Sequence, residues 1–196
     1  MAKLYFKHSP MNAGKSTNLL QVAHNYERDG HRVVLAKPST DTKGDDMIVS
    51  RIGASRRVDV LVSPLDNMRE RVLALGGIGL IACTLVDEAQ FLTREQVEQL
   101  RMLVDADKIP VMAYGLRTDF QKRGFPGSIA LFELADTLEE IRTVCRCMHK
   151  ATFNARLVNG EMVFEGDQVA MDGDNEVTYV PLCGPCYQQE QDKVGK

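Results

Sequence analysis

The segment from Ser9 to Thr17, Ser-Pro-Met-Asn-Ala-Gly-Lys-Ser-Thr, carries the residue types that a phosphate-binding loop needs. It fits the pattern G-x-x-x-x-G-K-[ST] except at its first position, where Ser9 replaces glycine. In such a loop, backbone N–H groups and a helix N-terminus surround a polyphosphate, the lysine reaches the β- and γ-phosphates, and the next hydroxyl coordinates Mg²⁺. We therefore predict that Lys15 contacts phosphate and that Ser16 holds the metal. The alternative is a Gly-Lys-Ser turn at an ordinary helix start.

Two carboxylates, Asp87 and Glu88, directly follow the apolar run from Leu80 to Val86. In P-loop proteins an acidic residue at this place holds Mg²⁺ or its water. We expect Asp87 to serve the metal and Glu88 to act as the general base that accepts a proton from the acceptor hydroxyl. Solvated carboxylates are also common at strand ends, so this interpretation depends on the phosphate loop.

Four cysteines form two closely spaced pairs, Cys145-Arg146-Cys147 and Cys183-Gly184-Pro185-Cys186. Two such pairs suit a tetrahedral Zn²⁺ with no open position, which describes a structural site. The first pair is tighter than the usual spacing, His149 is a substitute ligand to consider, and free or redox-active thiols are the alternative to zinc. Cys83 lies inside an apolar run and is expected in the core.

Strands and helices alternate through the first part of the chain, which predicts an α/β fold with a mostly parallel sheet and flanking helices. Apolar stretches predict strands over residues 3–6, 33–36, 58–62, 80–86 and 110–114, and the polar residues 39–46 predict a loop. Helices are expected from Lys15 to about Asp29, from Ser63-Pro64 to Gly76, and after Thr93, where Gln96 completes a capping box.

The pattern changes near Thr143, and we expect a P-loop domain over residues 1–142 and a small zinc-binding domain over 143–196. In the second part, Asn159-Gly160 separates two candidate strands, residues 153–158 and 161–164, as in a hairpin with a type I′ turn.

The composition excludes disordered and fibrous classes, because 44% of the residues are hydrophobic and 26% are charged. A net charge of -3 without a basic stripe argues against nucleic acid as a main partner. The sequence shows no signal peptide and no apolar run long enough for a membrane span, so we expect a cytoplasmic protein with reduced thiols.

Taken together, Ser9–Thr17, Val86–Leu92, Tyr114–Phe120 and the paired cysteines resemble the cytosolic-type (type II) thymidine kinases from Lys3 to about Tyr187. The resemblance implies a P-loop α/β domain followed by a small zinc domain whose lasso loop covers the nucleoside. It implies ATP-dependent phosphorylation of the thymidine 5′-hydroxyl for nucleoside salvage and DNA precursor synthesis. It also implies Mg²⁺-ATP as co-substrate, structural Zn²⁺, feedback inhibition by dTTP and a homotetramer.

The resemblance also assigns roles to individual residues, with Glu88 as the general base. The residues matched to nucleotide binding are Ser9, Pro10, Met11, Asn12, Ala13, Gly14, Lys15, Ser16, Asp87, Glu88, Ala89 and Gln90. Those matched to the thymidine pocket are Met11, Phe91, Leu116, Phe120, Phe125, Val169 and Tyr179. Core packing is the alternative role for Phe120 and Phe125.

The chain departs from its relatives at Lys43, where arginine is frequent, and at Asp174 in the lasso, where Gly-Gly is frequent. Arg51, in Ser50-Arg51-Ile52-Gly53, is a candidate to approach phosphates, but the sequence favours a surface arginine. The rival functions are another P-loop small-molecule kinase, a zinc-bearing P-loop ATPase acting on DNA, and a GTPase, although the chain has no Asn-Lys-x-Asp signature.

Overall fold

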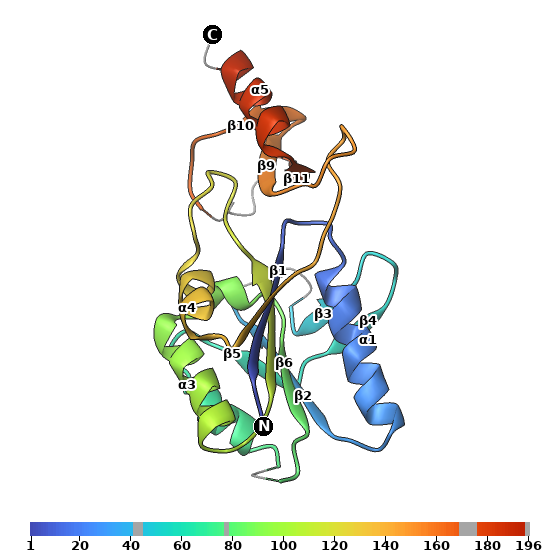
Figure 1. The fold of residues 1–196 in the computed structure, drawn as a ribbon, viewed down its shortest axis with the longest axis vertical. Coiled ribbons are helices and arrows are strands. Elements are labelled where there is room, and N and C mark those ends of the chain that lie inside the picture. Colours follow the sequence, from blue (N-terminus) through green and yellow to red (C-terminus); the bar gives the residue numbers. More distant parts are fainter. Residues whose placement is uncertain (41–44, 77–78, 169–175, 195–196) are drawn as a thin grey trace.

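A computed structural model describes residues 1–40, 45–76, 79–168 and 176–194 of the chain. Its main sheet has six strands in the order β5-β2-β6-β7-β1-β8, and every neighbouring pair is parallel (Figure 1). The prediction of an α/β fold with a parallel sheet is confirmed. The strands are β1 (Leu4–Ser9), β2 (Val33–Pro38), β5 (Val60–Val62), β6 (Cys83–Val86), β7 (Val111–Leu116) and β8 (Thr137–Glu140).

Helices cover both faces of this sheet (Figure 1). On one face lie α2 (Met68–Leu73), α3 (Arg94–Asp105) and α4 (Pro126–Leu134), and their apolar side chains share one buried cluster with Phe6 and Val34 of the sheet. On the other face lie α1 (Lys15–Arg28) and a small hairpin of β3 (Met47–Val49) and β4 (Ser55–Arg57). There Leu19 packs with Leu35 and Tyr114.

Helix α1 begins directly after the phosphate loop, as the sequence predicts. Gly14 precedes it with φ of +83°, a conformation that glycine adopts without the steric cost of a side chain. The helix ends at Arg28, and Gly30 follows with φ of +79°. The capping box of Thr93 and Gln96 at the start of α3 is also confirmed.

Two predicted boundaries are wrong. Helix α2 begins at Met68 rather than near Ser63, because the Asn67 side chain caps it by accepting the N–H of Glu70. Leu65, inside the predicted range of this helix, lies before its first residue and is 96% exposed. Strand β6 begins at Cys83 rather than at Leu80, whose side chain is 68% exposed in a turn.

The other strand predictions are partly correct. Strands β1, β2 and β7 extend further than expected, to Ser9, Pro38 and Leu116, whereas β5 starts two residues late. The sequence pattern did not predict β3, β4, β8 or α4, nor the last strand (Val177–Leu182) and the last helix (Gly184–Val194).

After β8 the chain forms a three-stranded antiparallel sheet in the order β10-β9-β11, followed by α5 (Gly184–Val194) at the far end of the molecule (Figure 1). Its strands are β9 (Phe153–Val158), β10 (Glu161–Val163) and β11 (Val177–Leu182). Asn159 and Gly160 between β9 and β10 have φ of +51° and +85°, as a type I′ turn requires. The predicted hairpin is confirmed, and the division into domains at residues 142 and 143 stays a prediction.

Within the described residues, no helix combines the length and the hydropathy needed to cross a membrane.

Candidate functional site

The phosphate loop occupies the carboxyl edge of the main sheet, between β1 and α1. Asn12 and Gly14 both have positive φ, so the loop turns sharply before the helix begins. The ammonium group of Lys15 lies back over this loop, where it donates to Ser9 Oγ and to the Pro10 carbonyl at 3.3 Å. Although it carries a charge, Lys15 is only 7% exposed, as expected for a cation held for a bound anion.

An open cavity of about 280 Å³ lies next to this loop. It brings together most of the residues that the sequence predicted for nucleotide binding, together with Glu88 and three of the predicted thymidine contacts. The lining residues are Met11, Asn12, Ala13, Gly14, Lys15, Ser16, Thr17, Val49, Ser50, Arg51, Ile52, Glu88, Gln90, Phe91 and Leu116.

Asp87 lies at the end of β6, against the first turn of α1. Its Oδ2 accepts a 3.0 Å hydrogen bond from the Ser16 hydroxyl, and within the described residues its buried Oδ1 has no hydrogen-bond partner. Burial, and next the negative charge of Glu88, raise the pKa of Asp87 to about 7. Asp87 thus offers a buried oxygen without a partner, close to the Ser16 hydroxyl and the Glu88 carboxylate. Such a group of oxygens fits a hard divalent cation such as Mg²⁺.

Glu88 lines the cavity in a strained backbone conformation, with φ of +47°. Its Oε2 accepts a 2.6 Å hydrogen bond from Gln90 Nε2, and Gln90 Oε1 in turn accepts the N–H of Leu116 at 3.0 Å. Gln90 therefore fixes the carboxylate of Glu88 relative to the end of β7. Close packing requires Gly115 here, since a Cβ would come within 2.9 Å of Gln90 Oε1.

Residues 89–92 pack closely on helix α4, and this packing requires a second glycine, Gly127, which the sequence pattern did not indicate. A Cβ on Gly127, in the first turn of α4, would lie 2.5 Å from the Ala89 carbonyl oxygen and 2.7 Å from that of Leu92. The next residue, Ser128, donates to the Leu116 carbonyl at 2.6 Å. Helix α4 thus supports the segment that carries Glu88.

Three predicted thymidine contacts, Met11, Phe91 and Leu116, line the cavity, whereas Phe120, Phe125 and Tyr179 are not among its lining residues. Phe125 is buried and meets Phe91 edge-on, with the ring centroids 5.6 Å apart. Phe120 is 1% exposed and lies under the guanidinium of Arg156 at 3.6 Å.

Tyr179, on β11, approaches the site through its backbone. Its carbonyl accepts a 3.3 Å hydrogen bond from the Asn12 side chain in the phosphate loop, and its hydroxyl accepts the Nε–H of Arg156 at 3.0 Å. The predicted contact Val169, the lasso residue Asp174 and the loop residue Lys43 lie outside the described residues.

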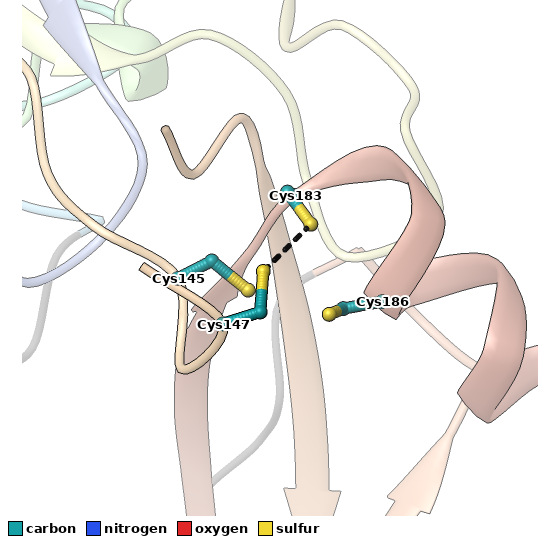
Figure 2. Close-up of side chains that lie close together, drawn as sticks. All are labelled: Cys145, Cys147, Cys183 and Cys186. Carbon is teal, nitrogen blue, oxygen red and sulfur yellow. Dashed lines mark hydrogen bonds between the residues drawn. The ribbon is translucent and has the colours of Figure 1, made fainter. Parts of the chain in front are cut away.

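Figure 2 shows the side chains of Cys145, Cys147, Cys183 and Cys186 converging on one point. Their sulfur atoms all lie within 4.8 Å of one another. Tetrahedral Zn²⁺ with bonds of about 2.3 Å separates its sulfur ligands by roughly 3.8 Å, so the four thiols fit this metal. Hydrogen bonding with the backbone and side chain of His149 lowers the pKa of Cys147 to about 6, whereas hydrogen bonding with the thiols of Cys147 and Cys183 raises the pKa of Cys186 to about 12.

Cys83 lies away from this cluster, in the core, as the sequence predicts, whereas His149 lies beside Cys147 of the cluster. Cys83 is buried in β6, and burial raises its thiol pKa to about 12. His149 is exposed, with its Nδ1 3.4 Å from Cys147 Sγ.

Comparison with known proteins agrees with this site. A family model described as thymidine kinase matches residues 2–187. Proteins named thymidine kinase from Ruegeria pomeroyi and Rhizobium meliloti are each 48% identical to the chain, and each match covers 93% of this chain. The matches cover 92% of the Ruegeria protein and 94% of the Rhizobium protein. A thymidine kinase from Chromobacterium violaceum is 44% identical, over 97% of this chain and 100% of its own length. The phosphate loop, the Asp87-Glu88 pair and the four-thiol cluster thus occur in a chain that belongs to the thymidine kinase family.

Proposed function

We propose that this chain transfers the γ-phosphate of ATP to the 5′-hydroxyl of thymidine, giving dTMP and ADP. The observation that carries the proposal is one cavity lined by the phosphate loop, by Glu88 and by the apolar side chains of Met11, Phe91 and Leu116, with Asp87 hydrogen-bonded to the lining residue Ser16. Membership of the thymidine kinase family supports the identity of both substrates.

In this proposal the phosphate loop binds the triphosphate of ATP. The N–H groups at the start of α1 and the ammonium of Lys15 provide positive potential for the β- and γ-phosphates. Ser16 Oγ and the unpartnered Oδ1 of Asp87 are the groups that would hold Mg²⁺. When bound, this ion neutralises charge on the β- and γ-phosphate oxygens.

Glu88 is the proposed general base. Its carboxylate accepts the proton of the 5′-hydroxyl while that oxygen bonds to the γ-phosphorus, and the bond from this phosphorus to the β–γ bridging oxygen breaks to release ADP. The hydrogen bond from Gln90 orients one carboxylate oxygen, which leaves the other to face the substrate. Such a base typically contributes about 10²–10⁴-fold to the rate.

The apolar wall of the cavity is the proposed site of the thymine ring. Met11, Phe91 and Leu116 suit a flat ring that carries a methyl group, because burying the ring face and the methyl group against apolar side chains is favourable and needs no particular orientation. We also propose roles for Phe120, Phe125, Val169 and Tyr179 here, supported by the sequence resemblance. For Tyr179, the contact of its carbonyl with Asn12 is a further argument.

The four thiols are proposed to bind a structural Zn²⁺ that takes no part in the chemistry. The two cysteine pairs precede β9 and follow β11, so the metal would join both ends of the segment that includes the proposed lasso. A homotetrameric assembly and dTTP as feedback inhibitor are proposals that rest on the sequence resemblance. A cytoplasmic location and separate domains over residues 1–142 and 143–196 are proposals that rest on the sequence pattern.

The direct test is transfer of label from [γ-³²P]ATP to a panel of acceptors with Mg²⁺ present. Thymidine should be labelled, whereas dTMP and 5′-deoxythymidine, which lacks the acceptor oxygen, should not be. Labelling of a different small molecule in preference to thymidine would indicate another P-loop kinase. ATP hydrolysis that depends on added DNA would indicate an ATPase acting on DNA.

A further inference from the structure

The hairpin of β3 and β4 lies along helix α1 and is attached to it by both apolar and polar contacts. Ile48 is buried in the same cluster as Leu19 and Ala23 of the helix. Near the far end of the helix, Arg56 Nη1 and Glu27 Oε2 form an ion pair at 2.5 Å. The hairpin is therefore docked as a unit on the helix that begins at the phosphate loop.

The tip of this hairpin is joined to the first turn of α1. The hydroxyl of Ser50, which is buried, shares a hydrogen bond with the hydroxyl of Thr17, the residue after Ser16. Ser50 also donates its N–H to the Ala54 carbonyl at 2.7 Å and accepts the N–H of Gly53 at 3.0 Å, so the turn is closed. Gly53 has φ of +94°, which this tight turn requires.

This attachment places Arg51 on the wall of the nucleotide cavity, together with Lys15, Ser16 and Glu88. Among the described residues that line the cavity, Lys15 and Arg51 are the two cations, whereas Asp87 and Glu88 put two carboxylates beside it. A triphosphate carries several negative charges, so a second protein cation close to it would stabilise the bound nucleotide further.

The hairpin arginines differ in their pairing. Arg56 bonds to Glu27, and Arg57 Nε lies 2.6 Å from Asp46 Oδ2. Across the part of the chain that the structure describes, the exposed Arg51 makes no hydrogen bond and no ion pair. Guanidinium binds phosphate oxygens in a bidentate manner and stays charged at all relevant pH values. A solvated surface arginine, which the sequence favours, does not account for this placement.

We propose that Arg51 is a second cationic ligand of the ATP polyphosphate, in addition to Lys15. The inference depends on the proposed function only in taking a nucleoside triphosphate as the ligand. The hairpin would place this arginine beside the phosphates in the same chain that carries the phosphate loop, so no partner protein would have to supply it.

The test measures binding of Mg²⁺-ATP and Mg²⁺-ADP by calorimetry, with thymidine absent, for wild type, Arg51→Ala, Arg51→Gln and the control Arg57→Ala. Loss of a charge-assisted hydrogen bond should weaken ATP binding by about tenfold in both Arg51 variants. An equal loss for ADP would assign the contact to the α- or β-phosphate, and a loss for ATP alone would assign it to the γ-phosphate; both results support the proposal. Arg57→Ala removes another exposed arginine of the same hairpin and should bind ATP as wild type does.

ATP dissociation constants within twofold of wild type in both Arg51 variants would overturn the proposal. So would an equal loss in Arg57→Ala, because that would indicate a general effect of surface charge. Melting temperatures of the variants show that the fold is retained. Since the assay contains no thymidine, failure to phosphorylate thymidine would refute the proposed function and leave this test intact.

Discussion

The side-chain oxygen of Asn154, in the small antiparallel sheet, accepts a 2.7 Å hydrogen bond from the backbone N–H of Met11 in the phosphate loop. The amide nitrogen of the same side chain donates to the Thr118 carbonyl at 3.1 Å. Asn154 is buried. One side chain from β9 therefore joins two loops at the edge of the main sheet, and the cysteine-rich part of the chain is coupled to the phosphate site.

Asn154→Ala should weaken both the fold and the site, because it leaves the N–H of Met11 and the carbonyl of Thr118, which are half-buried, without this partner. We expect the free energy of unfolding to fall by about 1–3 kcal/mol and the KM for ATP to rise. Denaturant unfolding and steady-state kinetics measure these effects. Asn25→Ala, at an exposed position of α1 where the side chain accepts a hydrogen bond from Gln21, is the control and should change neither. Equal stability of the two variants would contradict the role of Asn154.

Cys183→Ser should release the metal and affect thymidine more than ATP. The substitution removes one of the four thiols that are proposed to bind zinc, and this metal would join the two ends of the segment between Cys147 and Cys183. We expect less than one zinc per chain by elemental analysis, a lower Tm and a higher KM for thymidine. Cys83→Ser, at a buried cysteine outside the cluster, separates loss of metal from loss of a core thiol. Wild-type protein without zinc, or a zinc-free variant with unchanged thymidine KM and Tm, would contradict the assignment.

Thymidine should be preferred to deoxyuridine, since Met11 and Leu116 provide an apolar wall for the 5-methyl group. One methyl group in such a pocket is worth about 1–3 kcal/mol, so the ratio of kcat/KM values should be moderate. Leu116→Ala should reduce this ratio, whereas Leu138→Ala, at an exposed site on β8, should leave it unchanged. Equal kcat/KM for both nucleosides in wild type would indicate that the methyl group faces water.

The pKa of Asp87 predicts how stability depends on pH in protein free of metal and nucleotide. Burial raises this pKa from 3.8 to about 7, so between these values the folded state holds a proton that the unfolded chain has released. Stability should therefore fall as pH rises from about 4 to about 7. Asp87→Asn removes the titrating group, and its Tm should exceed that of wild type at pH 8 and approach it at pH 4. Parallel profiles for the two proteins would contradict this prediction.

Some of this site could be predicted because its residues are adjacent in sequence. Lys15 and Ser16 follow Gly14 directly, and the chemistry of phosphate binding requires that order. The cysteine pairs are separated by 35 residues, but the coordination geometry of zinc brings two such pairs together. In both cases the residue types and their spacing indicate how the side chains are arranged in space.

Other features depend on contacts between distant segments. Gly127 is needed because the helix that carries it meets the Ala89 carbonyl, and Asn154 matters because β9 approaches Met11. Nothing in the local sequence specifies either approach. The hairpin that positions Arg51 was missed because its strands are three residues long and one of them reads Ser-Arg-Arg, which lacks the apolar alternation of a strand.

The central claim is that Glu88 accepts the proton of the thymidine 5′-hydroxyl while the phosphate loop holds ATP. It is tested most directly by the rate of ³²P transfer from ATP to thymidine in Glu88→Gln, with ATP affinity measured on the same protein. Glutamine keeps the shape and the contact with Gln90 but cannot accept the proton at neutral pH. The account predicts that kcat falls by about 10²–10⁴-fold while the Kd for ATP stays close to that of wild type. A kcat near that of wild type would contradict it.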